Sequence, residues 1–347
     1  MTEFSTAKDI KVGVIGYGGA FNMGAQHLNL MEQAGMTPTA VADVDEERLE
    51  VAQEDFPGVE TFPSAEAMLA DSPVDLVAIV TPHNTHAELA VQCLEAGRSV
   101  VVEKPMALTT AECDRMIAAA DSNGALLSVF HNRHWDGCIL RAVQQVREEG
   151  TIGEVFRIEA HLGGYRAPGE WWRSSRSISG GILYDWGVHL LEYSLQLLDG
   201  DLVEVSGFNH TGFWSAQSPW GEDTNEDEAF AVARFDNGKW LTLCMSSIDS
   251  FPKNVHRNMV EVTGKRGTYM FGGGHYRSIV QTDGEPVEEE GENPPGERER
   301  YYANVAAALL GREELIITPQ WARRPIHIID LAVRSAEEGR TLEARYA

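Results

Sequence analysis

Five short runs rich in valine and isoleucine alternate with helical stretches in the first 130 residues, and this alternation restricts the fold more than any other feature. The runs lie at residues 10–16, 39–45, 74–82, 99–105 and 125–132. They are β-branched and bounded by turn residues, as buried strands are. Strands that alternate with helices pair in parallel through right-handed crossovers. We therefore expect an α/β domain with a doubly wound parallel sheet.

Residues that can cap the N-termini of the expected helices support this interpretation. Thr109 followed by Glu112 predicts a capping box for a helix that ends near residue 122. Ser64 and Asn84 are expected to cap two further helices.

The pattern changes near residue 130. After a helix over residues 138–150, alternating strands are expected at 154–162, 228–235, 239–248 and 258–264, with a "DNG" turn at 236–238. Hairpins of this kind build an antiparallel or mixed sheet. We expect two domains, residues 1–130 and 131–347, the second being α+β with a mostly antiparallel sheet. The acidic segment 282–300 is expected to be a surface loop, and residues 319–339 a helix.

Composition excludes several classes of protein. Acidic residues exceed basic ones by 25, a charge that disfavours nucleic acid and anionic membranes as partners. No apolar run approaches the roughly 20 residues of a membrane-spanning helix, and the first residues do not resemble a secretory signal. The four cysteines are scattered, which argues against a zinc or disulfide framework. These features predict a cytoplasmic protein without a metal site.

A glycine-rich turn follows the first strand in "VGVIGYGGAF". Backbone amides at such a turn, at the start of a helix, can bind a pyrophosphate. The third glycine of the GxGxxG fingerprint should stand at position 21, which is Phe21, so the fingerprint is incomplete and a turn without a ligand has the same appearance. The candidate cofactor residues of this turn are Gly16, Tyr17, Gly18, Gly19, Ala20 and Phe21.

Asp43, at the end of the second strand, supports a dinucleotide. A carboxylate at this position accepts the ribose hydroxyls of the adenosine and repels the additional phosphate of NADP. The next residues, Val44, Asp45 and Glu46, include no cation to bind that phosphate. The sequence therefore predicts NAD rather than NADP.

Polar residues also follow three other predicted strands. Ligands of doubly wound sheets bind beyond the carboxyl ends of the strands, so we expect these residues to face the ligand. Lys104, at the end of the strand "SVVV", is a cation placed at such an end. The expected contacts to the cofactor at these strand ends are Thr81, His83, Asn84, His86, Glu103, Lys104 and Asn132.

The second domain contributes Asp185 and His189, four residues apart in "GGILYDWGVH". On a helix they share one face, so the carboxylate can orient the imidazole and raise its basicity. A histidine on a helix is more often structural than catalytic. The pairing and the two preceding glycines favour a catalytic role.

The chain resembles the glucose-fructose oxidoreductase, inositol dehydrogenase and rhizopine catabolism family, known as Gfo/Idh/MocA. The matching stretches are the glycine turn, "TPHNTHAELA" at 81–90, "EKPMALT" at 103–109, "GTIGEV" at 150–155, "WWR" at 171–173, "GGILYDWGVH" at 180–189 and the tail at 318–343. They cover nearly the whole chain in the family's order.

This resemblance implies an N-terminal Rossmann domain that binds NAD and a C-terminal domain with a large open sheet, with the substrate between them. It implies that Lys104 contacts the hydroxyl being oxidised, that His189 takes its proton and that Asp185 orients His189 or contacts the substrate. A cis Lys104–Pro105 bond is common for this motif. Relatives often associate through the open sheet, so a homo-dimer or homo-tetramer is expected.

The predicted activity is transfer of a hydride between NAD and a secondary alcohol of a sugar, cyclitol or related polyol. The residues expected to line the substrate are Arg133, Tyr165, Trp172 and Arg173 in addition to Lys104, Asp185 and His189. Trp172 and Arg173 can equally brace the domain junction.

Three alternatives remain open. Some relatives oxidise a glycoside transiently at C3 so that elimination cleaves it, and the residues needed are nearly the same. A yeast galactose-pathway repressor of this family senses ligands without turnover, although a sensor has no need of a proton relay. A metal hydrolase is the weakest alternative, because no carboxylate or cysteine set completes the pairs His83/His86 and His131/His134.

Overall fold

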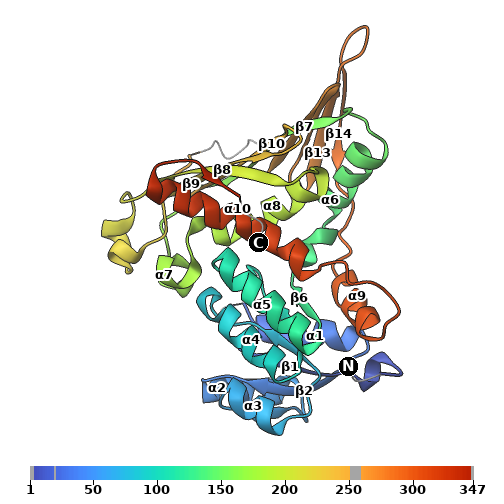
Figure 1. Ribbon diagram of the computed structural model, residues 1–347, viewed down its shortest axis with the longest axis vertical. Coiled ribbons are helices and arrows are strands. Elements are labelled where there is room, and N and C mark those ends of the chain that lie inside the picture. The colour runs from blue at the N-terminus through green and yellow to red at the C-terminus, as the bar shows by residue number, and fades with distance from the viewer. Residues whose placement is uncertain (1–3, 19–20, 251–258, 345–347) are drawn as a thin grey trace. The chain divides into compact units, whose positions relative to one another are not determined.

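The structure, a computed structural model, describes residues 4–18, 21–250 and 259–344 (Figure 1). The chain divides into two compact units. The first comprises Met1–Asn132 and Glu299–Arg323, and the second comprises Arg133–Arg298 and Arg324–Ala347. The sequence interpretation assigned residues 299–323 to the second domain, whereas here they group with the first.

The first unit is built on six parallel strands in the order β3-β2-β1-β4-β5-β6. Their bounds are β1 Lys11–Ile15, β2 Thr37–Ala42, β3 Glu60–Phe62, β4 Leu76–Ile79, β5 Ser99–Val102 and β6 Leu127–Val129. The strand order reverses direction beside β1, as in dinucleotide-binding sheets. This confirms the predicted doubly wound domain and adds β3, an edge strand too short to be recognised in the sequence.

Helices connect these strands, and Figure 1 shows α4 and α5 packed together. Their bounds are α1 Met23–Gln33, α2 Glu46–Asp55, α3 Ala65–Asp71, α4 His86–Glu95 and α5 Thr110–Asn123. The Thr109 capping box and the Ser64 cap are present as predicted. The predicted Asn84 cap is wrong, because Asn84 lies within a short 3₁₀ turn, His83–Thr85, and α4 begins only at His86.

The returning segment of the first unit carries α9, Arg300–Leu309. The Tyr301 hydroxyl donates to Ser128 Oγ at 2.9 Å, and Ser128 Oγ donates to the Ile317 carbonyl at 2.8 Å. Phe130 contacts the rings of Tyr301 and Tyr302. These buried contacts with β6 and its end explain why residues 299–323 belong to the first unit.

The described residues of the second unit form a nine-stranded sheet in the order β14-β13-β12-β11-β7-β10-β9-β8-β15. Only β7 and β10 pair in parallel, so the predicted mostly antiparallel sheet is confirmed. The bounds are β7 Val155–Gly163, β8 Leu202–His210, β9 Glu228–Phe235, β10 Trp240–Ser246, β11 Val260–Gly264, β12 Gly267–Phe271, β13 His275–Val280, β14 Val287–Glu292 and β15 Leu342–Glu343.

The prediction of a loop over residues 282–300 is wrong in its middle, where β14 forms the edge of this sheet. Its glutamates are held across the strand pair, since Glu288 binds Arg277 and Glu289 accepts from the Tyr276 hydroxyl at 2.6 Å. Charged side chains are typical of exposed edge strands because they discourage pairing with another chain. The acidic composition of this segment therefore led to the prediction of a loop where β14 forms.

Helices cover one face of the sheet in the second unit. The helices in the described part of this unit are α6 Gly137–Ala142, which continues as a π-helical turn Val143–Glu148, α7 Arg176–Ser179, α8 Trp186–Leu197 and α10 Pro319–Glu338, of which residues up to Arg323 group with the first unit. The helix α8 packs on β7 and β10, and it is buried all around from Gly187 to Leu197. A Cβ on Gly207 of β8 would lie 1.8 Å from the Ala332 carbonyl oxygen, so α10 approaches β8 closely.

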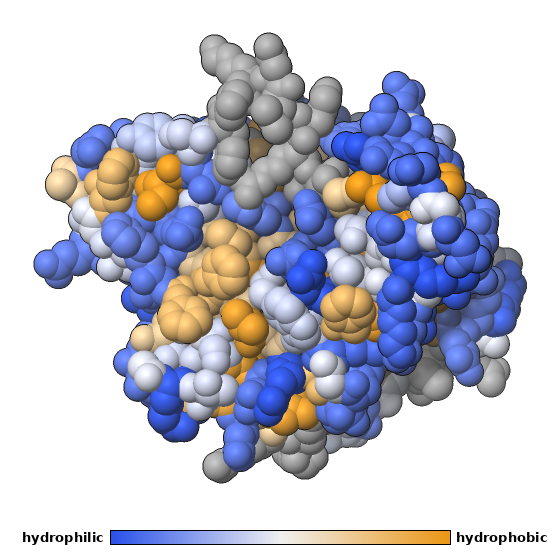
Figure 2. All heavy atoms as spheres, turned by 90° about the horizontal axis from the view of Figure 1, so that it is seen from above, coloured by the Kyte–Doolittle hydropathy of each residue, from blue (hydrophilic) through white to orange (hydrophobic). Residues whose placement is uncertain are grey.

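The opposite face of this sheet carries the alternate residues of each strand. One row pairs Phe208 of β8 with Phe230 of β9, and the next pairs Ser206 with Val232. Figure 2 views the molecule from above and shows hydrophobic side chains interrupted and surrounded by hydrophilic ones. Phe208 is 63% exposed. No helix within residues 4–18, 21–250 and 259–344 has the length and apolar character needed to span a bilayer.

Candidate active site

The glycine turn after β1 has the backbone geometry that a nucleotide requires. Gly16 has φ +94°, and a Cβ there would lie 2.5 Å from the Val80 carbonyl oxygen, so only glycine is accommodated. A Cβ on Gly18 would meet no heavy atom within 4 Å, so the backbone at Gly18 faces open space. Gly19 and Ala20 lie outside the described residues.

Asp43 holds this turn. Its Oδ2 accepts from the Tyr17 amide at 2.5 Å and its Oδ1 from the Asp45 amide at 3.0 Å. The Tyr17 side chain is buried and donates to Asp55 at 2.9 Å, and burial raises the pKa of Tyr17 above its ordinary value. Tyr17 can therefore meet a cofactor only through its backbone.

The third glycine of the fingerprint is displaced along the sequence. Phe21 is 58% exposed, and α1 begins two residues later at Met23. Gly24 instead makes the close contact expected of that glycine, because its Cβ would lie 2.9 Å from the Gly16 carbonyl oxygen and 3.0 Å from the Tyr17 Cα. The sequence interpretation missed Gly24 because the turn is longer than the fingerprint allows.

These features together fit a dinucleotide. An open backbone at Gly18, a helix that starts beside it, and a carboxylate at the end of β2 are the parts that bind a pyrophosphate and an adenosine ribose. Each oxygen of Asp43 has a second lone pair available beyond the bond to the backbone.

The strand ends beyond β4 and β5 are joined by His86. Its Nδ1 lies 2.8 Å from the Pro105 carbonyl oxygen and its Nε2 lies 3.0 Å from the Thr81 carbonyl oxygen. Thr81 Oγ1 lies 2.7 Å from Thr85 Oγ1. His83 and His86 are both buried, whereas Asn84 is exposed. His86 therefore ties the 81–86 turn to the turn that contains Lys104.

Glu103 turns its carboxylate toward the interior of the first unit. Its Oε1 lies 3.2 Å from His27 Nε2, and its Oε2 accepts from the Lys104 amide at 2.9 Å. His27 Nδ1 in turn lies 2.5 Å from the Tyr302 hydroxyl, so α9 supports this strand end through a buried chain. The Lys104–Pro105 bond is cis, and Lys104 is partly exposed.

In the second unit, Asp185 precedes α8 rather than lying within it. It is the N-cap residue, with φ −86° and ψ −83°, and His189 lies in the first turns of the helix. Arg173 Nη1 donates to Asp185 Oδ1 at 2.9 Å. The Arg173 guanidinium also lies over the Trp172 ring, 4.9 Å from its centroid. The predicted residues Trp172, Arg173 and Asp185 therefore meet.

His189 and Arg133, another residue predicted for the site, both contact Trp186. The buried ring of His189 contacts Trp186 edge-on, with centroids 5.4 Å apart, and the guanidinium of Arg133 lies 4.6 Å from the centroid of Trp186. Arg133 also donates to Asp136 Oδ2 at 2.9 Å. Trp186 was missed as a member of this group, although its place between Asp185 and His189 was a usable signal.

Tyr165 belongs to a separate aromatic cluster. Its ring contacts Phe213 at 6.1 Å and Trp214 at 5.2 Å between centroids. Tyr165 and Phe213 are exposed. Asn132, the last residue of the first unit's initial segment, is partly buried in the 3₁₀ turn Asn132–Trp135. Within the residues described, no three histidine, cysteine, aspartate or glutamate side chains form a group that could hold a metal ion.

Known families match both units of the chain. Residues 10–131 match the Gfo/Idh/MocA family described as "Oxidoreductase family, NAD-binding Rossmann fold". Residues 145–344 match its second part, described as "Oxidoreductase family, C-terminal alpha/beta domain".

Individual relatives are more distant. The uncharacterized oxidoreductase YdgJ of Escherichia coli is 29% identical over 96% of this chain and 98% of its own length. The scyllo-inositol 2-dehydrogenase (NADP(+)) IolW of Bacillus subtilis is 33% identical over 54% of this chain and 51% of its own. The crystal structure of an NAD-binding protein from Listeria innocua has a TM-score of 0.80 at 28% identity and covers 97% of both chains.

Proposed function

Because the chain belongs to the Gfo/Idh/MocA oxidoreductase family, we propose that it is an NAD-dependent dehydrogenase of a sugar, cyclitol or related polyol. The observation that carries this proposal is the position of Lys104. It follows β5, whose neighbour β4 pairs with β1, and the glycine turn follows β1. The carboxyl ends of parallel strands lie at one edge, so a cation and a dinucleotide turn share that edge of the sheet.

The nicotinamide, when bound, supplies the hydride acceptor or donor. In the oxidative direction His189 takes the proton of the reacting hydroxyl, a step that general-base catalysis accelerates by about 10²–10⁴. The Lys104 ammonium stabilises the negative charge that develops on the same oxygen. Asp185, held by Arg173, lies at the start of the helix that carries His189 and orients the base or the substrate.

NAD is the proposed coenzyme. The Asp43 carboxylate would repel a 2′-phosphate, and Val44, Asp45 and Glu46 offer it no cation. Arg48, in the first turn of α2, forms an exposed ion pair with Asp45 at 3.9 Å. The name of the relative IolW carries NADP(+), so the test is kcat/KM with each coenzyme. Equal or higher kcat/KM with NADP would overturn the assignment.

A cyclic polyol is the proposed substrate class. Within the second unit, Arg133, Trp172 and Arg173 provide guanidinium donors and an indole close to Asp185 and His189. Hydroxyl groups accept from arginine, and the apolar faces of sugar and cyclitol rings pack on aromatic rings. The name of the relative IolW, scyllo-inositol 2-dehydrogenase, supports the same class.

The experiment is a coenzyme-reduction assay with inositols, aldoses, glycosides and their keto forms. We expect Lys104→Ala and His189→Ala to lower kcat by about 10²–10⁴. Lys265→Ala, at an exposed lysine paired with Glu154, is the matched control and keeps the parental rate. Parental rates in both catalytic variants would refute the assigned roles. Cleavage of a glycoside without net NADH would identify the eliminating reaction instead.

We further propose that the protein is a cytoplasmic homo-dimer or homo-tetramer that associates through the open face of the nine-stranded sheet. Phe208, Phe230 and Val232 offer this face apolar area. The four cysteines are buried and are not part of disulfides, as suits a reducing compartment. Sedimentation should show an oligomer that Phe208→Lys dissociates, and a monomeric parent would refute the assembly. Cell fractionation tests the compartment.

A further inference from the structure

Two consecutive carboxylates in the second unit, Glu226 and Asp227, are both buried, at 4% and 1% exposure. Each is satisfied by a different segment of the chain. Glu226 Oε2 accepts from the Ile182 amide at 3.0 Å, and its Oε1 lies 3.2 Å from Arg176 Nε. Buried carboxylates are costly unless they are paired and hydrogen-bonded, so these bonds fix where both segments lie.

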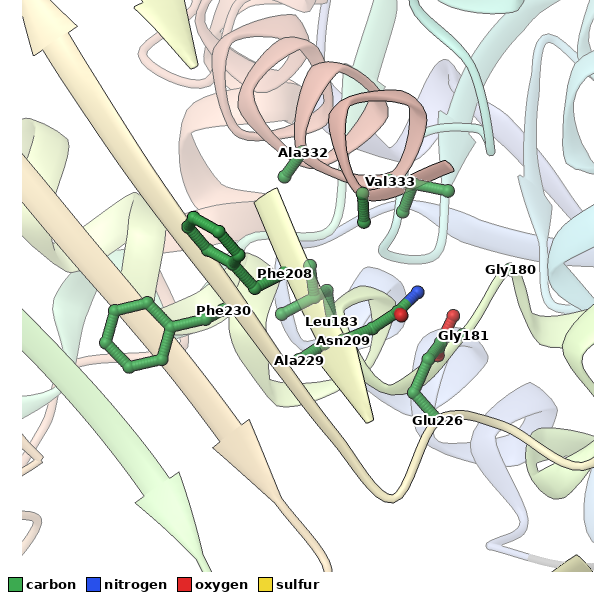
Figure 3. Close-up of a pocket in the computed structure, with 11 residues that line it drawn as sticks. Gly180, Gly181, Leu183, Phe208, Asn209, Glu226, Ala229, Phe230, Ala332 and Val333 are labelled. Atoms are coloured by element: carbon green, nitrogen blue, oxygen red, sulfur yellow. The ribbon is translucent and has the colours of Figure 1, made fainter. Parts of the chain in front are cut away.

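Gly181 makes the approach of Glu226 possible. Its φ is +121°, and a Cβ at this position would lie 2.5 Å from Glu226 Oε2. Figure 3 shows Glu226, Asn209 and Gly181 around one pocket, with Ala332 and Val333 of α10 on its other side. A residue with a side chain at position 181 would therefore displace the carboxylate from the next amide of the chain.

The anchored amide begins the segment that leads to Asp185. Ile182–Tyr184 form a 3₁₀ turn, Asp185 follows as the N-cap, and α8 with His189 starts at once. No residue intervenes between the turn that Glu226 anchors and Asp185. A shift of this turn would therefore change the direction in which α8 starts.

The strand-like segment before Glu226 fastens the partner of Asp185 as well. Asn225 Nδ2 donates to the Arg173 carbonyl oxygen at 2.7 Å, and the Asn225 amide donates to the Ser174 carbonyl oxygen at 3.0 Å. Thr224 forms a β-bridge with Ser175. Residues 224–226 therefore hold both sides of the Arg173–Asp185 ion pair.

We infer that Glu226 is a positioning residue, which fixes the Gly181–Asp185 turn and through it the orientation of Asp185 and His189. It acts through the Ile182 amide and touches neither the proposed substrate nor the coenzyme. This inference rests on the proposed dehydrogenase function for its kinetic consequence, but the anchoring itself can be measured without any activity.

Asp227 provides a matched control. It is equally buried, and it accepts from the amides of Phe213 at 2.8 Å and Trp214 at 3.0 Å rather than from the turn before α8. Removing either carboxylate costs the unit a buried anion and its hydrogen bonds, and for Asp227 also the contact with His210 Nδ1 at 3.5 Å. Only Glu226 is bonded to the segment that leads to Asp185.

Hydrogen exchange of the full chain is the first measurement. In Glu226→Ala we expect the peptide covering residues 181–186 to exchange at least about tenfold faster, which corresponds to the loss of about 1.4 kcal/mol of protection. In Asp227→Ala the faster exchange should appear around residues 213–214 instead. Unchanged exchange at 181–186 in Glu226→Ala, with the variant folded by circular dichroism, would overturn the inference.

Steady-state kinetics is the second measurement. Glu226→Ala should lower kcat by about tenfold or more with KM for NAD unchanged, because a misplaced base slows the chemical step while the glycine turn is intact. Glu226→Gln, whose amide oxygen can still accept from Ile182, should recover most of kcat, and Asp227→Ala should keep kcat within about threefold. Equal kcat losses in Glu226→Ala and Asp227→Ala would mean general destabilisation and would refute the positioning role of Glu226.

A parent protein without dehydrogenase activity would refute the proposed function. The hydrogen-exchange experiment would still show whether Glu226 anchors the turn before α8.

Discussion

Gly18 and Gly24 lie in one turn-and-helix segment but should respond oppositely to a single added methyl group. In Gly24→Ala the new Cβ would lie 2.8 Å from Tyr17 Cδ2 and 2.9 Å from the Gly16 carbonyl oxygen. Backbone cannot move away as a flexible side chain does, so α1 must shift from β1. Overpacking of this kind costs about 1–3 kcal/mol.

The net effect of Gly24→Ala is smaller than this cost, because alanine is the better helix former by up to about 1 kcal/mol. We expect a net loss of about 1–2 kcal/mol in the free energy of unfolding. For domains of this size that corresponds to a fall in Tm of roughly 3–6 °C. NAD affinity should fall as well, since the turn is displaced.

Gly18→Ala should instead leave the stability of the protein unchanged, because nothing lies within 4 Å of the added Cβ. The methyl group would occupy the space through which a pyrophosphate approaches the backbone, so NAD should bind about tenfold or more weakly. The assays are urea unfolding without coenzyme and calorimetric titration with NAD. A Gly24→Ala protein as stable as the parent, or parental NAD affinity in Gly18→Ala, would refute the assigned roles of these glycines.

Three further outcomes follow from local contacts. Thr109→Ala removes the side chain that accepts from the Glu112 amide and should cost about 0.5–2 kcal/mol in urea unfolding, and an unchanged midpoint would contradict the capping role. Tyr301→Phe removes the buried bond to Ser128 and should cost about 0.5–1.5 kcal/mol by the same assay, with a neutral result counting against α9 as a support of β6. Burial raises the pKa of the Cys93 thiol to about 12 and that of Cys138, which also faces Asp136, to about 11, so both remain protonated at pH 8. Iodoacetamide should therefore modify them only after unfolding, and rapid labelling of the native protein, seen by mass spectrometry, would be the contrary result.

The parts of the fold that local pattern determines were predictable. Strands β1, β4 and β5 are continuous apolar runs, and the Thr109 capping box needs only two residues. The position of α9 was not predictable, because it depends on contacts between Tyr301 and Ser128 that are far apart in the chain. The strand β14 was missed because its exposed glutamates are typical of a loop, and their partners Arg277 and Tyr276 are known only once β13 is seen to pair with β14.

The candidate site was predicted in its residue types more than in its local geometry. The i, i+4 spacing placed Asp185 and His189 on one helix, whereas Asp185 occupies the N-cap position just before it, where aspartate is common. Glu103 was expected to face the cofactor, yet it is directed toward His27, a histidine on the buried face of α1. Spacing alone cannot give the direction of a side chain when a partner from another element determines it.

The two-segment composition of the first unit has a consequence for synthesis of the protein. A ribosome that has made residues 1–132 has not yet made Tyr301 and Tyr302, the residues against which Phe130 and His27 pack. Part of the apolar surface of the first unit therefore stays exposed until the whole intervening segment has been synthesised. Expression of residues 1–132 alone should consequently yield an aggregation-prone fragment rather than an independent nucleotide-binding domain.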